Sequence, residues 1–469
     1  MALPKDSFLQ KENIDKVLSN YLSTQFEIDE QLFFSSKLAI LDTVGCIFEA
    51  YSHDNVAQFA RNDLNPKNFN NPFLVLDKIQ SHNEQTWFLT VLTRWFDYND
   101  TFLAKEWAHP SDNFGAIYSY FFENKNLKFE DFIISLIQAY EIQGSLSLGT
   151  SLNKLGFDHV FFVKIAAGSV FANLLHKGDN RKLQRTVNNI LADGPTLRSY
   201  RHFPNVGRRK SWAAADASRR GIELAILSTF DDEVYEDIQN DPNWGFEKVF
   251  MANSTLEFGK ELDTWVMKNV LFKVLYPAEF HGQSAIEAAI SLSSEFLTNQ
   301  NKIESINVYT HEPAIRIISN KITLKNASDR DHSLEYMVAA GLLFGDLNYS
   351  MYEEDFYGFK EIECLRRKIS VKENIEFTKN YYDFEKRDIS NSVELVYSDG
   401  SVSNKVTVVN PLGHPSRRNE AVELLKEKFI KNLSTFLDSN TSIKLWEEII
   451  SIKLDASFAD FANILEQYV

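Results

Sequence analysis

Carboxylates, a hydroxyl group and an imidazole gather among aromatic residues in one stretch of the chain, residues 94–118. The stretch reads RWFDYNDTFLAKEWAHPSDNFGAIY, and its polar members are Asp97, Asp100, Thr101, His109, Ser111, Asp112 and Asn113. Burial among rings moves the pKa values of such groups toward neutral pH, which proton-transfer catalysis requires. The alternative is ordinary capping, because the polar run after Pro110 can also start a helix.

Basic side chains gather in a second stretch, residues 198–220, although the chain carries a formal net charge of −16. Its cations are Arg198, Arg201, Arg208, Arg209, Lys210, Arg219 and Arg220, and its one acid is Asp216. Guanidinium forks and a lysine point charge suit carboxylate or phosphate ligands. The alternative is a solvated basic loop, or arginines that pair with acids elsewhere in the chain.

Two shorter segments place polar groups at the start of an expected helix. The first, LFKVLYPAEFHGQSAIEAA, contains Lys273, Glu279 and His281. In the second, NASDRDHSLEYMVAAGLLFGDL, His332 and Tyr336 are four residues apart and would point the same way from a helix. A helix N-terminus favours an anionic group nearby, but a loop and a helix cap explain both segments as well. The turn that contains His414 is a weaker signal of the same kind.

Signatures of other enzyme classes are missing from the sequence. There is no G-x-S-x-G elbow, no P-loop, no dinucleotide fingerprint after a strand, and no H-E-x-x-H spacing. Two cysteines, Cys46 and Cys364, are too few for the usual ligands of an iron–sulfur cluster. The residues therefore indicate an acid–base site without cofactor or metal for an anionic substrate, which fits a lyase or isomerase better than a redox enzyme.

Helical periodicity dominates the region that must position the first two stretches. Apolar residues recur at three and four positions in the segments 32–51, 129–144 and 159–176. Several of these segments are apolar on more than one face, which is typical of helices in the middle of a helical domain. A chain of 469 residues exceeds the size that one hydrophobic core usually supports, so we expect two domains.

After about residue 270, the sequence pattern changes from mainly helical to a mixture of helix-like and strand-like segments. Segment 305–319 looks strand-like, and segment 393–409 reads as a hairpin with a turn at Asp399 and Gly400. The C-terminal tail returns to helical periodicity. We therefore predict a mainly α fold with an α+β second domain. Residues 1–269 and 410–469 would form a discontinuous helical domain, and residues 270–409 an α+β lid domain, with a cleft between them.

Charge and composition limit the partners and the compartment. The acidic charge argues against binding to nucleic acids and against adsorption to anionic membranes. Uninterrupted apolar runs of about 18 residues do not occur, so no transmembrane helix is expected. The N-terminal segment has no apolar core of signal-peptide type, and the low cysteine content suits a reducing cytoplasm. We expect a cytoplasmic protein.

Four blocks together resemble the MmgE/PrpD family: the stretch from Arg94, the basic stretch, and the segments that contain Lys273 and His332. The resemblance runs in order over nearly the whole chain and ends with NPLGHPSRR. It implies a helical domain and a smaller α+β domain, with the active site between them, and a homodimer. It also implies elimination of water from the tricarboxylate 2-methylcitrate in propionate breakdown by the methylcitrate cycle, without an iron–sulfur cluster. The alternatives are cis-aconitate decarboxylation, as in a relative of the same superfamily, and binding without catalysis.

The resemblance also suggests roles for individual residues. The relative's Asp-x-x-x-Thr and His-Pro-Ser elements are similar to Asp97, Thr101 and His109, although two more residues separate Thr from His here. The longer segment EWAHPSDN is of the dehydratase type. On this basis the substrate-binding residues would be Thr101, His159, Arg201, Lys210 and Lys273. The catalytic residues would be His109 with Asp97, and Tyr336 or His281 as the second acid–base group.

Overall fold

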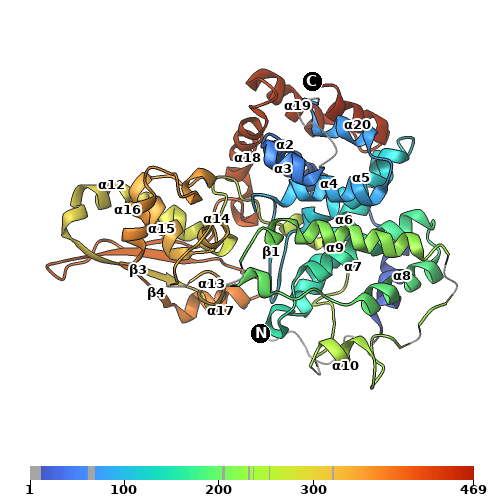
Figure 1. The fold of residues 1–469 in the computed structure, drawn as a ribbon, viewed down its shortest axis with the longest axis horizontal. Coiled ribbons are helices and arrows are strands. Elements are labelled where there is room, and N and C mark those ends of the chain that lie inside the picture. The colour runs from blue at the N-terminus through green and yellow to red at the C-terminus, as the bar shows by residue number, and fades with distance from the viewer. Residues whose placement is uncertain are drawn as a thin grey trace.

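Two large hydrophobic cores divide the molecule into a helical body and an α+β body (Figure 1). The computed structural model describes residues 12–61, 69–202, 206–230, 233–235, 237–252, 254–319 and 322–468. Residues 1–11, on which the prediction of no signal peptide partly rests, lie outside these ranges. The larger core joins residues from Ile14–Val274 with residues from Ala421–Leu465, and the smaller core lies within Tyr276–Leu395. The predicted fold class, mainly α with an α+β part, is confirmed.

Long apolar helices form the centre of the helical body. Its helices are α1 (Ile14–Ser23), α2 (Glu30–Tyr51), α3 (Asp54–Ala60), α4 (His82–Arg94), α5 (Phe114–Glu123), α6 (Phe129–Gly149), α7 (Val160–Leu175), α8 (Asn180–Asp193), α9 (Arg209–Leu227), α10 (Phe246–Phe250), α11 (Trp265–Asn269), α18 (Arg418–Leu433), α19 (Ser439–Ser451) and α20 (Phe458–Glu466). The three helical segments predicted from periodicity lie on α2, α6 and α7. A Cβ atom at Gly168 of α7 would lie 2.9 Å from the carbonyl oxygen of Gly221 in α9, so glycine permits this close packing.

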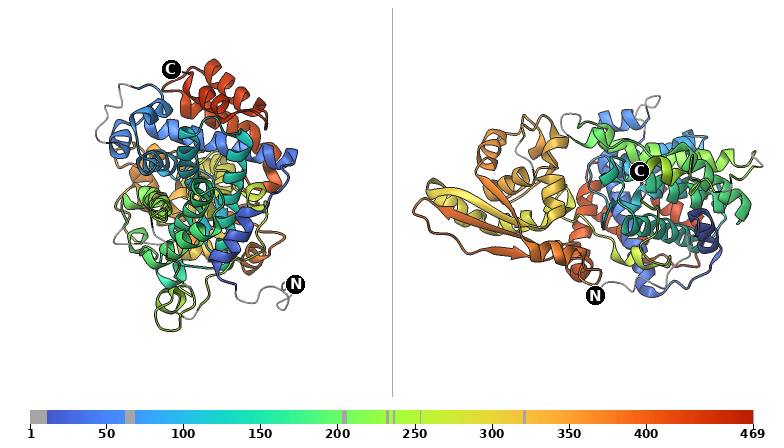
Figure 2. Two further views of the ribbon diagram at one scale, coloured as in Figure 1. Left: turned by 90° about the vertical axis from the view of Figure 1, so that its right-hand side faces the viewer. Right: turned by 90° about the horizontal axis from the view of Figure 1, so that it is seen from below.

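The C-terminal helices pack onto the N-terminal part of the chain. Phe429 of α18 lies against Gly45 of α2, where an added Cβ would be 3.4 Å from the ring. Both views show the red C-terminal helices beside the blue N-terminal ones (Figures 1 and 2). The division into residues 1–269 with 410–469 and residues 270–409 remains our proposal, which this separation of the cores supports.

The α+β body, which we call the lid, contains a four-stranded mixed sheet. Its elements are α12 (Gln283–Asn299), β3 (Ile303–Thr310), α13 (Glu312–Ile318), α14 (Ala327–Arg330), α15 (Leu334–Phe344), α16 (Phe359–Arg366), β4 (Ile369–Glu373), α17 (Ile375–Tyr382), β5 (Asn391–Tyr397) and β6 (Val406–Val408). The strand order is β4-β3-β5-β6, with β3 parallel to β4 and antiparallel to β5. Residues of α12 and α15 share the lid core with β3 and β5.

The strand-like pattern at 305–319 was only partly right. The strand ends at Thr310 because His311 caps a new helix by accepting a hydrogen bond from the Ala314 amide, 3.3 Å away, and Pro313 occupies its first turn. The turn at Asp399 and Gly400 is confirmed, with Gly400 at a φ of 84°. Strand β6 begins only at Val406, so the ladder after this turn is shorter than predicted.

The chain passes between the two bodies twice, at Phe272 and at Gly413, and the two segments lie side by side. We call this pair of segments the double crossing. At the double crossing, the Phe272 amide donates to the Gly413 carbonyl oxygen at 3.1 Å. A Cβ at Gly413 would lie 1.8 Å from the Phe272 oxygen, so only glycine fits there. Leu271 also exchanges two backbone hydrogen bonds with Thr101, each 2.8 Å long. The first crossing therefore places Lys273 next to the stretch predicted to do chemistry.

Helix α2 is long and apolar enough to span a membrane by length and composition alone, and it is the one such helix in the described ranges. Of its most apolar window, 72% is buried inside the protein, where it packs against α4 and α18. The central core helix of a globular protein passes the same test. Its length therefore does not indicate a membrane span.

Candidate active site

The predicted site segments converge on one narrow cavity where the lid meets the helical body. Its lining residues are Arg94, Asp97, Thr101, Leu103, Trp107, His109, His159, Arg198, Arg201, Lys273, Glu279, Phe280, Ile317 and His332. Six of the nine residues predicted from the sequence are therefore brought together. The cavity volume is about 20 Å³, enough for about one water molecule.

A short hairpin forms one wall of the cavity and explains why the first stretch is bent. Strands β1 (Phe102–Leu103) and β2 (Trp107–Ala108) pair in antiparallel fashion. Between them, the buried carboxylate of Glu106 accepts from the backbone amide of Asn153 at 2.7 Å and from its side-chain amide at 2.9 Å. The hairpin turns the chain back so that residues before and after it face the same space.

The first stretch divides into a helix start and a cavity wall. Pro110–Asn113 form a 3-10 turn that leads into α5, so a helix does start here as the alternative predicted, but neither element has a side-chain cap. Asp100 braces this turn, because its Oδ1 accepts from the Ser111 amide at 3.0 Å and from the Ser111 hydroxyl at 2.7 Å. Burial raises the pKa of Asp100 to about 6. The residues before the turn, Asp97 and His109, line the cavity instead.

Two cations converge on the carboxylate of Asp97. Arg94 NH1 donates to its Oδ1, and Lys273 Nζ lies 2.8 Å from the same oxygen. Asp97 has a φ of 51°, a left-handed conformation that is strained for a residue other than glycine and recurs at functional sites. Burial alone would raise the pKa of Asp97, but the charges of Arg94 and Lys273 outweigh burial and hold this pKa well below its usual range.

His109 is held as a neutral imidazole with an assigned tautomer. Its Nδ1 lies 2.7 Å from the Asp100 carbonyl oxygen, which can only accept, so Nδ1 carries the proton. Its Nε2 lies 2.9 Å from Arg94 NH2 and therefore presents a lone pair. Burial, followed by the charge of Arg94, holds the pKa of His109 well below its ordinary value. A neutral imidazole that lines a cavity, and whose acceptor nitrogen is held by an arginine, can act as a general base once substrate takes over that arginine.

Buried polar atoms without partners also belong to residues that line the cavity. Arg201 binds the buried carboxylate of Asp158 through Nε, while Arg201 NH2 and Arg198 NH1 are buried without hydrogen-bond partners among the described residues. The same holds for Nε2 of His159. Burial costs such donors free energy unless a partner binds them, so their arrangement favours an anionic ligand.

The rest of the basic stretch follows the solvated alternative. Arg209 and Arg219 share Asp216 near the surface, each at 3.1 Å. Arg220 pairs with Asp193 at 2.8 Å. Among the residues of this stretch that the structure describes, Arg198 and Arg201 are the ones that line the cavity.

Lys210 joins the helical body to the lid rather than lining the cavity. Its Nζ lies 2.7 and 2.8 Å from the two carboxylate oxygens of Asp331, and 3.1 Å from Nδ1 of His332. His332 itself lines the cavity. The predicted lysine is thus adjacent to the site and ion-paired across the domain junction.

His281 and Tyr336 are placed behind the cavity wall, at different depths. The ring of His281 is covered by Glu279, which lines the cavity, with Nδ1 2.7 Å from Glu279 Oε1. The Tyr336 hydroxyl donates to the Met351 carbonyl oxygen at 2.6 Å, inside the lid core. The structure therefore does not bring Tyr336 to the cavity, because α15 turns that face toward the lid interior.

Replacing Tyr336 with phenylalanine tests its position. Since the hydroxyl group makes one hydrogen bond within the described residues, to the Met351 carbonyl, we expect a loss of about 1 kcal/mol in the free energy of unfolding. We expect kcat to stay within a factor of about 3, because no interaction made in the transition state is removed. Steady-state kinetics and urea unfolding measure both quantities. A fall of kcat by about 100-fold or more would instead identify Tyr336 as an acid–base group.

A buried lysine from the C-terminal helix α18 braces the site from behind. Lys428 Nζ donates to Asp42 Oδ1 of α2 at 2.6 Å, and also to the carbonyl oxygens of Tyr98 and Lys273 at 2.6 and 2.9 Å. This contact could not be predicted, because Lys428 is more than 150 residues from each of its three partners. Arg94, Glu279 and Trp107 were also missed as site residues, although they lie inside the predicted stretches.

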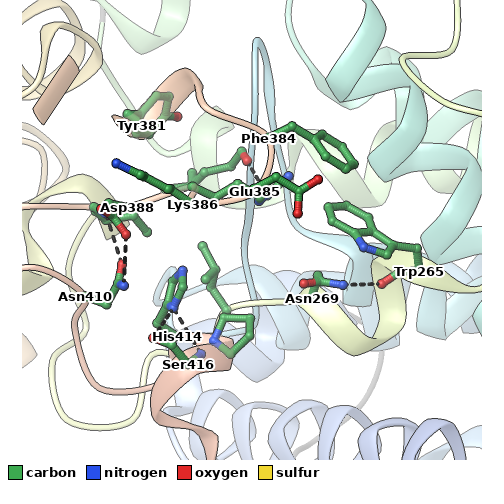
Figure 3. Close-up of a pocket in the computed structure, with 15 residues that line it drawn as sticks. Trp265, Asn269, Tyr381, Phe384, Glu385, Lys386, Asp388, Asn410, His414 and Ser416 are labelled. Atoms are coloured by element: carbon green, nitrogen blue, oxygen red, sulfur yellow. Dashed lines mark hydrogen bonds between the residues drawn. The ribbon is translucent and has the colours of Figure 1, made fainter. Parts of the chain in front are cut away.

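A larger cavity of about 490 Å³ lies on the other side of the hairpin (Figure 3). Trp265, Tyr381 and His414 are among the residues around it, and it shares Leu103 with the narrow cavity. Burial lowers the pKa of His414 to about 4. We place the active site in the smaller cavity because the convergent cations, the neutral imidazole and the unpartnered donors are there.

Comparisons with known proteins agree with this architecture. Residues 22–259 match the model of the MmgE/PrpD N-terminal domain, and residues 276–451 match that of the MmgE/PrpD C-terminal domain. The 2-methylcitrate dehydratase of Escherichia coli (strain K12) is 35% identical over 460 residues, covering 94% of this chain and 92% of the relative. That of Cupriavidus necator is 36% identical over 447 residues, covering 91% of each. The mitochondrial 2-methylcitrate dehydratase of Yarrowia lipolytica is 34% identical over 446 residues, covering 90% of this chain and 85% of the relative. The resemblance seen in the sequence is confirmed, and the chain belongs to the MmgE/PrpD family.

Proposed function

We propose that this protein is a 2-methylcitrate dehydratase, a hydro-lyase that removes water from 2-methylcitrate to give 2-methyl-cis-aconitate in the methylcitrate cycle. One observation carries the proposal: a neutral imidazole, His109, lines the same cavity as the cations Arg94, Arg201 and Lys273, with unpartnered donor atoms among the arginines. Similarity to dehydratases of this name over nearly the full chain supports it. A base beside positive groups is what proton abstraction next to a carboxylate requires.

The first proton transfer is assigned to His109. When a substrate carboxylate binds Arg94, the guanidinium releases Nε2 of His109. The Nε2 lone pair then takes the proton from the carbon next to a substrate carboxylate, and the electrons of that bond form the new double bond. The Nδ1–H group stays hydrogen-bonded to the Asp100 carbonyl oxygen, so the ring becomes an imidazolium without rotating. Asp97, 3.8 Å from Nε2, stabilises that cation, which is the role of a buried carboxylate beside a catalytic histidine.

The positive side chains bind the three carboxylates of the substrate. Lys273, Arg201 and Lys210 are assigned to this role, with Thr101 and His159 beside them. Negative charge grows on a carboxylate as the proton leaves, and fixed cations lower the free energy of that transition state more than that of the ground state. The unpartnered NH2 group of Arg201 supports this assignment, because a substrate carboxylate would supply its missing acceptor.

Substrate must be admitted by separation of the two bodies. A cavity of about 20 Å³ holds about one water molecule, far less than a tricarboxylate needs. The Lys210–Asp331 ion pair spans the junction between the bodies. When the lid opens, Lys210 would release Asp331 and bind a substrate carboxylate in its place. A closed site excludes water, which strengthens the electrostatic interactions inside it.

A substrate panel tests the proposed function. We expect the purified protein to convert 2-methylcitrate, with a new alkene absorbance and no carbon dioxide, before and after treatment with a chelator. In the described ranges, no group of three or more His, Cys, Asp or Glu residues is placed to hold a metal ion, which motivates the chelation arm. Citrate and cis-aconitate complete the panel. Carbon dioxide release from cis-aconitate would favour the decarboxylase instead, and loss of activity on chelation would contradict a cofactor-free reaction.

We also propose that the protein is a homodimer in the cytoplasm. The dimer is an expectation from the family, and the low cysteine content together with the acidic charge supports the compartment. Light scattering after size-exclusion chromatography measures the assembly. A single species with the mass of one chain would contradict the dimer.

A further inference from the structure

A glutamate stands between the cavity and the histidine behind it. Glu279 lines the cavity, and both of its oxygens bind His281. Its Oε1 lies 2.7 Å from Nδ1 of His281, and its Oε2 accepts from the His281 backbone amide at 2.9 Å. His281 is fully buried. A proton held by His281 therefore reaches the cavity through Glu279.

Tyr381 assigns the tautomer of His281. The Tyr381 hydroxyl donates to the Ala104 carbonyl oxygen at 3.3 Å, and its oxygen lies 3.0 Å from Nε2 of His281. Because the carbonyl group can only accept, the hydroxyl proton is directed to it and the phenol oxygen accepts from Nε2–H. Nε2 therefore keeps its proton, and Nδ1 is the nitrogen free to exchange a proton with Glu279.

Aromatic and titratable groups surround this pair. Tyr381 comes from α17, and the ring of His311 lies 5.3 Å from that of His281 and 4.8 Å from that of Tyr381. Lys273 and His332 are the other charged or titratable groups that act on Glu279. Burial would raise the pKa of Glu279, but the charge of His281 and its hydrogen bond outweigh burial and lower this pKa.

We propose that Glu279 and His281 share one mobile proton and deliver it through Glu279 to the departing hydroxyl group, with Tyr381 as the positioning residue. This rests on the proposed function, for which it supplies the second acid–base group. The carbon–oxygen bond breaks with its electron pair on oxygen, and the mobile proton joins that oxygen to form water. Glu279 is left as a carboxylate facing an Nδ1 without a proton. When the bodies separate, a proton from solvent returns to the pair, while His109 loses the one taken from carbon.

The first test uses a leaving group that needs no proton. The analogue of 2-methylcitrate with fluorine in place of the hydroxyl group releases fluoride directly, so it depends on the base but not on the acid. We expect Glu279→Gln to lower kcat on 2-methylcitrate by about 10²–10⁴-fold. On the fluoro analogue, followed with a fluoride electrode, the same variant should stay within about tenfold of wild type, whereas His109→Ala should fail on both substrates.

The second test addresses Tyr381 through the pH profile. Tyr381→Phe removes the acceptor of Nε2–H, which makes protonated His281 less favourable in its buried position. The pair then loses its mobile proton at lower pH, so the alkaline limb of kcat should move down by about one pH unit. Tyr382→Phe is the matched control, because its hydroxyl binds Glu312 at the surface, 3.0 Å away, and should leave the profile unchanged.

The outcomes separate the two proposals. The shared proton would be overturned if Glu279→Gln lowered kcat equally on both substrates, or if a folded Tyr381→Phe protein kept the wild-type pH profile. In either case an active wild type would still uphold the dehydratase. A wild type that converts none of the tricarboxylates would overturn the proposed function and, with it, the role given to Glu279. Thermal unfolding of each variant verifies that it is folded before kinetics are compared.

Discussion

Replacing His109 with alanine is expected to lower kcat on 2-methylcitrate by about 10²–10⁴-fold while the protein stays folded. The ring lines the cavity in a tautomer fixed by the Asp100 carbonyl at 2.7 Å, with Nε2 as the acceptor nitrogen. Steady-state kinetics with circular dichroism as a folding check measures the effect. KM should change less than kcat, because the carboxylate-binding cations remain.

A matched control and a pH profile sharpen this prediction. His176→Ala removes a histidine that contacts the Ala225 carbonyl at 3.0 Å, away from the cavity, and should leave kcat unchanged. In the wild type, a base with a lowered pKa stays deprotonated at neutral pH, so the acid limb of the profile should lie below pH 6.5, its ordinary value. Near-normal turnover in a folded His109→Ala protein would refute the assignment.

Replacing Lys428 with methionine is expected to lower the free energy of unfolding by about 3–5 kcal/mol, because the change leaves Asp42 as a buried, uncompensated charge. Lys428 is 4% exposed and Asp42 is 2% exposed, so solvent does not screen their pairing. Two backbone carbonyls of the site, at Tyr98 and Lys273, lose their donor as well. Urea unfolding with linear extrapolation measures the loss.

The double variant Asp42→Asn with Lys428→Met provides the control. It removes both charges while keeping similar shapes, so most of the lost stability should return. Burial raises the folded pKa of Asp42 even with Lys428 beside it, and in Lys428→Met the loss of that positive charge raises this pKa further. The deficit is then complete above that folded pKa and shrinks as the pH falls through it, where Asp42 becomes neutral. Equal stabilities of the single variant and the wild type would contradict a structural role for the pair.

Groups that lie close in sequence could be predicted, because local geometry brings them together. Asp97 and His109 flank one hairpin, and their residue types alone suggested acid–base chemistry. The helical segments could be predicted as well, because the apolar pattern with a period of 3.6 residues is still visible in the buried helices α2 and α7. The strand at 305–310 was overextended because Ile and Val patterns do not distinguish a strand from a short helix after Pro313.

Contacts between distant segments could not be predicted. The basic stretch looked uniform, yet Arg201 is drawn into the cavity by Asp158, whereas Arg219 pairs with Asp216 near the surface. Tyr381 is 100 residues from His281 and joins it only because α17 packs against the hairpin. Such positions depend on which acceptor or charge the fold delivers, and composition or periodicity does not carry that information.

The double crossing makes the lid an insertion whose two ends meet. Phe272 and Gly413 are hydrogen-bonded across it, although more than 100 residues separate them in the chain. The lid therefore adds little loop-closure entropy to the helical body once it has folded. A short turn between these two positions would join both halves of the helical body into one continuous chain, so the lid is connected to that body at a single point of the fold.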